Sequence, residues 1–243
     1  MRDDSVMDVV LVHSGVTDSG EWDGVRRELE AAGHRVLAPD LPGYGRRPEE
    51  PREFSLGRFV LGLDFERAAL VGTSLGSRGV LEAVLMAPER VDACVLVSPN
   101  PFGWGEGVQR LSEQEEALFE ERRLDEAADV MVRAWVVGPH REDDDVPAAL
   151  RSRVHAMQKR AYELQEGVEG RHVRLEIEPA KVRAPTLVIR GALDQDDLGA
   201  AERLAREIPD ARLVVYDDCA HLPTMEQPDR VARDVLEFLA SVS

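Results

Sequence analysis

One segment constrains the fold of this chain more than any other, residues 70–76 with the sequence LVGTSLG. It is an apolar stretch that runs into Gly-x-Ser-x-Gly and continues into a helix-like segment, 78–86, which stops before Pro88. In that context Ser74 lies on a sharp turn between a strand and a helix, where the flanking glycines let the backbone crowd behind an outward-facing serine. Amides at the start of the helix then face any oxyanion that forms beside it. Ser74 is therefore a candidate nucleophile, and the amide of Leu75 is a candidate oxyanion donor.

Apolar, β-branched runs elsewhere in the chain are typical of buried parallel strands. They cover 8–13, 35–39, 68–72, 93–98, 185–190 and 212–216. Helical patterns follow or separate most of them, at 22–32, 56–63, 78–86, 200–208 and 228–240. Strands that alternate with helices predict an α/β fold, with a mostly parallel sheet of about six strands flanked by helices on both faces.

This alternation breaks between residues 99 and 175, where consecutive helices are predicted with no strand between them. Ser112 with Glu115 predicts a capping box for the first, Asp125 predicts an N-cap for the second, and Pro147 suits the first turn of the third. We expect a core made of residues 1–98 and 176–243. We expect residues 99–175 to form a helical cap above the carboxyl ends of the strands, where open α/β sheets bind ligands.

A serine hydroxyl needs an adjacent base, which is itself oriented by a third group. His221 is the candidate base among the 6 histidines, because it lies in a loop between the last predicted strand and the last predicted helix. Asp194 is the candidate acid, because it follows the strand predicted at 185–190. Asp196 and Asp197 are alternatives, although an N-cap role for the next helix suits them better.

An oxyanion hole needs two backbone donors. The amide of Leu75 is one, and the loop after the first predicted strand should supply the other. Within that loop we favour Gly15 over Val16, and we expect the ring of His13 to hold the loop through hydrogen bonds.

Together these residues resemble the α/β-hydrolase superfamily over nearly the whole chain. Further likeness comes from the D-x-x-G-x-G segment 40–45, the G-x-x-D turn 191–194, and segment 220–228, which is similar to a G-H…E-x-P ending. The order nucleophile, acid, base along the chain is also that of this family. The closest resemblance is to small, capped, cofactor-free esterases and enol-lactonase-like hydrolases, which implies no cofactor. The chain departs from the pattern where Ser14, Ser77 and Ala220 replace common glycines.

Composition restricts the partners and the setting. The net charge of −17 argues against nucleic acids and anionic membranes as partners. The chain starts with the charged segment 1–4 and its first apolar run, 9–12, is short, so no signal peptide is expected. No apolar stretch approaches twenty residues, so no membrane span is expected. The 2 cysteines, Cys94 and Cys219, are far apart in sequence and favour a reduced, cytoplasmic setting. Because no His or Cys cluster has metal-ligand spacing, we predict no metal.

The predicted activity is hydrolysis of a small or medium carboxylic ester or lactone through an acyl-Ser74 intermediate. Trp104, Met131 and Trp135 are the predicted walls of the substrate pocket. Three alternatives stay open on the same residues. They are a hydrolase of carbon–carbon bonds, a perhydrolase in which peroxide intercepts the acyl-enzyme, and a ligand receptor of this fold that does not turn over.

Overall fold

The computed structural model describes residues 6–49, 53–168, 171–195 and 199–242. Its centre is a 6-stranded sheet with the strand order β2-β1-β4-β5-β7-β8, and all neighbouring strands are parallel. The strands are β1 (Asp8–Val12), β2 (Arg35–Leu37), β4 (Ala68–Thr73), β5 (Val91–Val97), β7 (Thr186–Gly191) and β8 (Ala211–Tyr216). The predicted α/β sheet of about six strands is confirmed.

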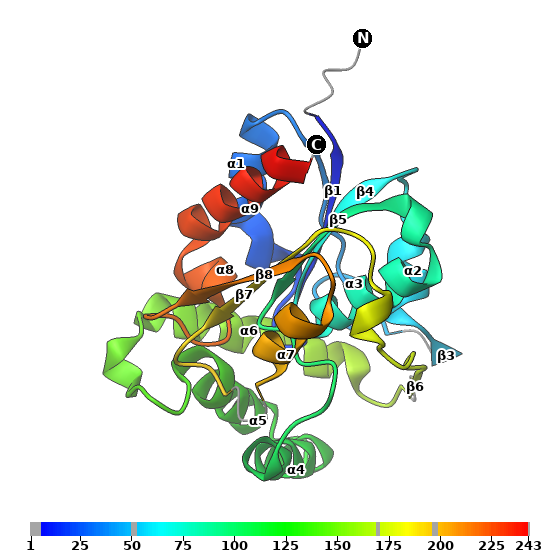
Figure 1. Cartoon of the computed structure of the whole chain (residues 1–243). Coiled ribbons are helices and arrows are strands. Elements are labelled where there is room, and N and C mark those ends of the chain that lie inside the picture. The colour runs from blue at the N-terminus through cyan, green and yellow to red at the C-terminus, as the bar shows by residue number, and fades with distance from the viewer. Residues whose placement is uncertain (1–5, 50–52, 169–170, 196–198, 243) are drawn as a thin grey trace.

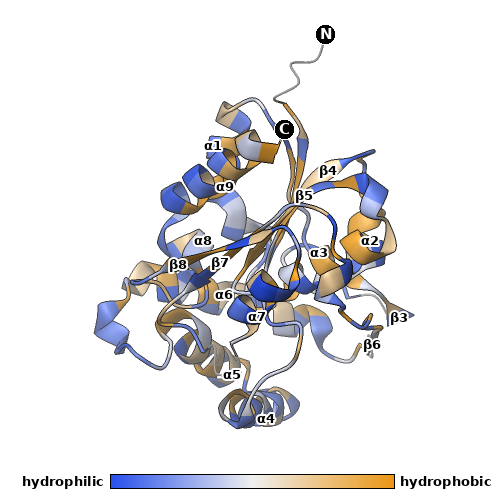
Figure 2. Ribbon diagram, viewed as in Figure 1, coloured by the Kyte–Doolittle hydropathy of each residue, from blue (hydrophilic) through white to orange (hydrophobic). Residues whose placement is uncertain are grey.

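Helices cover both faces of this sheet (Figure 1). One face packs against α1 (Asp23–Ala31) and α9 (Pro228–Val242), and the other packs against α2 (Leu56–Leu61), α3 (Leu75–Met86) and α7 (Ala200–Glu207). Side chains alternate between the two faces, so that Val9 and Leu11 join one core while Val10 and Val12 join the other. Figure 2 shows the resulting layers, with apolar strands between helices that turn polar surface outward.

A second group of helices lies between β5 and β7 in the sequence, beyond the carboxyl ends of the strands (Figure 1). Its elements are α4 (Glu106–Glu120), α5 (Leu124–Met131), the π-helix η3 (Val132–Val137), the 3-10 turn η4 (Asp143–Asp145) and α6 (Ala148–Gln165). We call residues 99–175 the cap below. Its own apolar cluster includes Trp135, Val136 and Val154, and it packs on Val16 and Leu222 of the core.

The cap helices begin elsewhere than their sequence signals predicted. Helix α4 starts at Glu106, so Ser112 lies in its interior and the predicted capping box is wrong. Helix α5 starts at Leu124 and its N-cap is Arg123, which puts Asp125 inside the first turn, where it pairs with Lys159. Pro147 directly precedes α6. The early start of α4 agrees with the burial of Val108. This side chain lies before Ser112 in the helix and extends its apolar, core-facing side toward the N-terminus.

Short elements complete the chain. A two-stranded parallel ribbon that the sequence did not indicate joins β3 (Glu53–Phe54) to β6 (Arg171–His172). The others are η1 (Ser19–Trp22), η2 (Pro88–Arg90), η5 (Pro179–Lys181) and α8 (Pro223–Glu226). Among the described residues, none of the helices has both the length and the apolar character needed to cross a membrane.

Candidate active site

Ser74 occupies a strained turn between β4 and α3. Its backbone has φ 51° and ψ −109°, in the region that favours glycine. The turn closes because its flanking glycines have no side chains, since a Cβ on Gly76 would lie 2.0 Å from the carbonyl oxygen of Val12. A Cβ on Gly72 would lie 2.4 Å from the carbonyl carbon of Gly76. The sequence G-x-S-x-G is thus required here by space, and it leaves Ser74 at the carboxyl edge of the sheet.

Hydrogen bonds fix this turn to the neighbouring strand. The Ser74 amide donates to the carbonyl of Val97 at 2.9 Å. The hydroxyl of Ser77, a residue that replaces a common glycine, donates to Gly72 O at 2.6 Å and contacts Val97 O at 3.1 Å. Ser77 therefore adds bonds that tie the turn to β4 and β5.

Asp194 and His221 lie together at the same edge. The Nδ1–H of His221 donates to Asp194 Oδ2 at 2.8 Å, and the two side chains are only 6% and 2% exposed for Asp194 and His221 respectively. Their loops are also joined through the backbone, because Leu193 N donates to Cys219 O at 2.9 Å. The bond between the side chains fixes the imidazole tautomer, with the proton on Nδ1 and Nε2 left to accept one.

The strand order places Ser74 at the same edge of the sheet as this pair. Strands β4, β5, β7 and β8 are consecutive in the sheet and parallel, so Ser74, Asp194 and His221 all follow carboxyl ends. Within the described part of the chain no hydrogen bond joins Ser74 to the imidazole; such bonds are often long in unliganded enzymes. Asp196 and Asp197 lie outside the described residues, and Gly199 holds the N-cap position of α7.

The loop after β1 faces the start of α3. A Cβ on Gly15 would lie 3.6 Å from Cβ of Leu75, which brings the two proposed oxyanion donors to one place. The amide of Val16 donates to the hydroxyl of Ser14 at 3.3 Å, so it is already engaged. The geometry therefore favours Gly15 over Val16 as the second donor.

A buried carboxylate supports this loop, and sequence reasoning missed it. Glu21 is 2% exposed and accepts hydrogen bonds from the Ser14 amide at 2.8 Å and from Thr224 Oγ1 at 2.8 Å. It also accepts one from Thr17 Oγ1. Glu21 thus connects the loop after β1 to helix α8, which follows His221. A glutamate in a short, mostly polar turn carries no sequence signal that marks it as buried.

The ring of His13 also holds the loop after β1 through hydrogen bonds. Its Nδ1–H donates to Ser14 O at 2.7 Å, and its Nε2 accepts from the Leu41 amide at 2.9 Å. Burial lowers the pKa of His13 from 6.5, more strongly than the backbone hydrogen bond to Ser14 raises it. The neutral ring therefore acts as a bridge within the fold.

Two indole rings of the cap cover the candidate base. The ring centroid of Trp135 lies 4.4 Å from that of His221, and Trp104 lies 4.8 Å from Trp135 and 6.1 Å from His221. Met131 packs in the same apolar cluster. Of the three residues predicted as pocket walls, Trp104 and Trp135 lie against the ring of His221, with Trp135 in the closer contact, and Met131 belongs to the apolar cluster of the cap.

Polar groups at the end of β5 border a small cavity beside the candidate acid. The cavity has a volume of about 10 Å³, and its lining includes Ser98, Asn100, Trp104 and Asp194. Ser98 has φ 43°, and its hydroxyl and the side-chain amide of Asn100 are buried with no partner among the described residues. The space suits one water-sized polar group. Sequence reasoning attached no weight to these positions because they carry no carboxylate.

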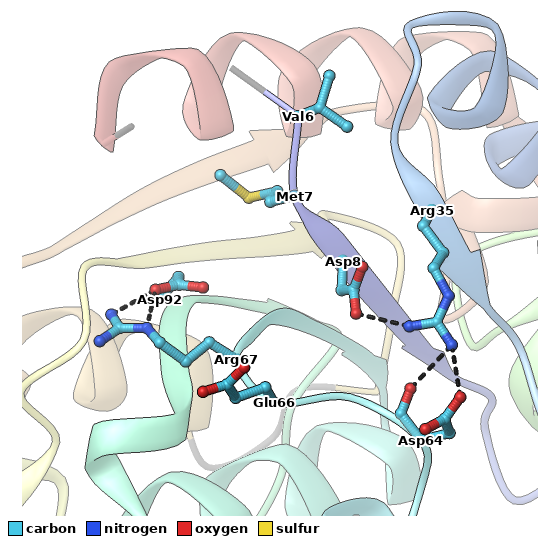
Figure 3. A pocket seen from close by; sticks show the side chains of 8 residues that line it. All are labelled: Val6, Met7, Asp8, Arg35, Asp64, Glu66, Arg67 and Asp92. Carbon is cyan, nitrogen blue, oxygen red and sulfur yellow. Dashed lines mark hydrogen bonds and ion pairs between the residues drawn. The ribbon is translucent and has the colours of Figure 1, made fainter. Parts of the chain in front are cut away.

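A larger pocket of about 730 Å³ lies at the opposite edge of the sheet, near the amino ends of the strands (Figure 3). Its two arginines form ion pairs with neighbouring aspartates. Arg35 contacts Asp8 at 2.7 Å and Asp64 at 2.9 Å, and Arg67 donates to Asp92 at 2.8 Å. Because this pocket is remote from Ser74 and its cations are already paired, it does not contribute to the candidate site.

Known proteins resemble this chain over nearly its whole length. The 2-hydroxy-6-oxo-6-phenylhexa-2,4-dienoate hydrolase of Burkholderia cepacia is 29% identical, over 96% of this chain and 87% of that protein. The pimeloyl-[acyl-carrier protein] methyl ester esterase of Nitrosomonas europaea is 28% identical, over 92% of each chain. The solved enol-lactonase of Burkholderia xenovorans superposes with a TM-score of 0.75 at 21% identity, covering 99% of this chain and 94% of that chain, and so shares the fold.

The family model for the alpha/beta hydrolase family matches residues 9–234. That span includes the strained serine turn, the acid turn, the base loop and the cap. The resemblance drawn from the sequence motifs is confirmed, and the chain belongs to the alpha/beta hydrolase family.

Proposed function

We propose that this protein is a serine hydrolase that cleaves a small or medium carboxylic ester or lactone through an acyl-serine intermediate. The hydrogen bond between Asp194 and His221, at the sheet edge where a strained turn holds Ser74, is the observation that carries this proposal. A buried carboxylate that orients the base is the arrangement that serine nucleophiles require.

The proposed reaction follows from these groups. Ser74 Oγ attacks the carbonyl carbon while its proton moves to His221 Nε2, and the amides of Gly15 and Leu75 stabilise the oxyanion. The tetrahedral intermediate collapses, and the leaving alcohol takes the proton from Nε2. Water then attacks the acyl-serine ester, gives a proton to Nε2, and releases the carboxylic acid as Ser74 recovers its proton.

Cleavage of a carbon–carbon bond by the same residues is the second candidate. Similarity to known proteins favours this second reaction, because dienoate hydrolases are among the curated proteins most similar to this chain. In that reaction a carbon leaves in place of the alcohol oxygen, so His221 protonates carbon. The two candidates therefore differ in the leaving group and share the nucleophile.

The test compares hydrolysis of p-nitrophenyl acetate, butyrate and octanoate with that of 2-hydroxy-6-oxo-6-phenylhexa-2,4-dienoate, using wild type, Ser74→Ala and Ser112→Ala. Ser112 is an exposed serine of α4 and serves as the control. We expect ester turnover and fluorophosphonate labelling that Ser74→Ala alone abolishes, a loss of about 10³-fold or more. Faster turnover of the dienoate would favour the second candidate. Equal activity in wild type and Ser74→Ala would refute both.

A further inference from the structure

The cap makes direct contact with both loops that carry the candidate acid and base. Gly138, which ends the π-helix η3, has φ 80° and lies between these loops. A Cβ on Gly138 would lie 2.7 Å from Leu193 O in the acid turn and 3.2 Å from Cβ of Ala220, the residue before His221. Three backbone segments from distant parts of the sequence therefore meet at one point.

Side chains of the acid turn and of the cap donate hydrogen bonds to the last backbone carbonyls of η3. Gln195, the residue after the candidate acid, donates from Nε2 to Ala134 O at 2.9 Å. Arg141 donates from Nη2 to Val136 O at 2.7 Å and from Nε to Val137 O at 2.9 Å. The π-helix that carries Trp135 is thus held by one residue of the acid turn and by one arginine of the cap.

The same arginine reaches the loop of the candidate base. Arg141 Nη1 contacts Glu226 Oε2 at 2.6 Å, with side-chain exposures of 11% and 9%. The second carboxylate oxygen, Glu226 Oε1, accepts the amide of Ala220 at 2.9 Å. A continuous chain of bonds therefore runs from the cap backbone through Arg141 and Glu226 to the residue adjacent to His221.

We propose that Arg141 is a positioning residue, which uses the carboxylate of Glu226 to hold the His221 loop in register with the cap. The proposal rests on the function proposed above. A guanidinium can serve the two carbonyls and the carboxylate at once because it presents five donors in a rigid plane. Loss of Arg141 would leave Glu226 buried without its cation, so the carboxylate would turn toward solvent and release the Ala220 amide.

A groove leads to this ion pair from outside. It has a volume of about 530 Å³ and is lined by Arg141, Glu226, Met225 and Arg153 among others. Arg153 offers a matched control, because it also joins the cap to the core, donating to Gly20 O at 2.6 Å and Asp23 Oδ2 at 2.6 Å. Among the described residues it forms no bond to the acid turn or to the loop of the candidate base. The groove gives a small guanidinium ion access to the space that Arg141 would leave.

The experiment measures kcat and KM for p-nitrophenyl butyrate in wild type, Arg141→Ala, Arg141→Lys and Arg153→Ala, each checked for folding by circular dichroism. We expect kcat of Arg141→Ala to fall by about 10- to 100-fold with KM changed less than about twofold, because a displaced base slows chemistry more than binding. Guanidinium ion at a non-denaturing concentration should restore kcat in Arg141→Ala only. Arg141→Lys should recover part of the loss, and Arg153→Ala should match wild type.

A second readout separates this proposal from the proposed function. The proton in the hydrogen bond between His221 Nδ1 and Asp194 should give a low-field resonance in the NMR spectrum of wild type. This resonance should broaden or shift in Arg141→Ala and stay unchanged in Arg153→Ala. If wild type neither turns over nor reacts with a fluorophosphonate, the proposed function fails and this resonance alone decides the role of Arg141. A folded Arg141→Ala protein with unchanged kcat and resonance, or with a raised KM alone, would overturn the proposal.

Discussion

Gly191 meets Ala220 so closely that a Cβ on the glycine would lie 2.2 Å from the carbonyl oxygen of Ala220. The end of strand β7 and the loop before His221 therefore share a space that only a residue without a side chain can fill. This contact sets how near the acid turn can come to the base loop.

A methyl group at this contact should push the two loops apart. We expect Gly191→Ala to lower the free energy of unfolding by about 1–3 kcal/mol through overpacking, and to lower kcat as the Asp194–His221 bond lengthens. Urea denaturation and ester hydrolysis measure the two effects. Gly107→Ala is the control, because this glycine lies in α4 and a Cβ there would meet no atom of the described residues within 4 Å. The free energy of unfolding of this control should stay within about 0.5 kcal/mol of wild type, because Gly107 is exposed in the first turn of the helix.

Ser74 should show a conflict between stability and activity. Its φ of 51° strains any residue with a side chain, and glycine adopts this conformation freely. We expect Ser74→Gly to raise the free energy of unfolding by about 1 kcal/mol while it abolishes hydrolysis. Thermal unfolding of Ser74→Gly, Ser74→Ala and wild type measures the difference, and a Ser74→Gly protein no more stable than Ser74→Ala would contradict it.

His13 should make the fold sensitive to acid. Because burial lowers its pKa from 6.5, the unfolded chain takes up a proton below that pH that the folded protein does not bind. Stability should be complete above pH 6.5 and fall as the pH drops below it, and His34 adds in the same direction because its pKa is also lowered from 6.5. His13→Gln keeps an acceptor for the Leu41 amide and cannot titrate. Urea denaturation at a series of pH values should give a shallower slope for this variant.

The two cysteines should be inert in the native protein. Cys94 and Cys219 are both fully buried, and burial raises the pKa of each thiol to about 12. Since the thiolate is the reacting species, Ellman's reagent should label neither until the protein unfolds. Rapid labelling of one thiol without denaturant would show that its loop opens.

The sequence predicted the parts of the fold that depend on local pattern. Buried parallel strands such as β4 and β5 are apolar throughout, so their positions were correct to within a few residues. The helix starts in the cap were predicted less well. Tertiary packing sets where α4 and α5 begin, and neither helix begins at the N-cap signal that the sequence offered, Ser112 or Asp125. The ribbon formed by β3 and β6 has two residues in each strand, which are too few to show an alternating pattern of apolar and polar residues.

In the candidate site, too, some residues could be predicted from the sequence and others could not. Ser74, Asp194 and His221 follow strands whose ends could be read from the sequence, and the pairing of Asp194 with His221 is present in the structure. The supporting groups could not be predicted, because Gln195 and Arg141 are ordinary polar residues in loops and Glu21 lies in the short 3-10 turn η1. Their roles depend on which loops meet in space, and pairs such as Glu21 with Thr224 are separated by most of the chain.

The insertion of the cap between β5 and β7 has a consequence for synthesis of the chain. Because β7 pairs with β5 across the whole insertion, the ribosome must complete the cap before the sheet can close on that side. Until then the nascent chain presents β5 as an uncovered apolar edge, and this edge is the point at which a stalled or truncated product would aggregate. The strands that precede the candidate acid and the candidate base, β7 and β8, therefore join the sheet only in the final part of translation.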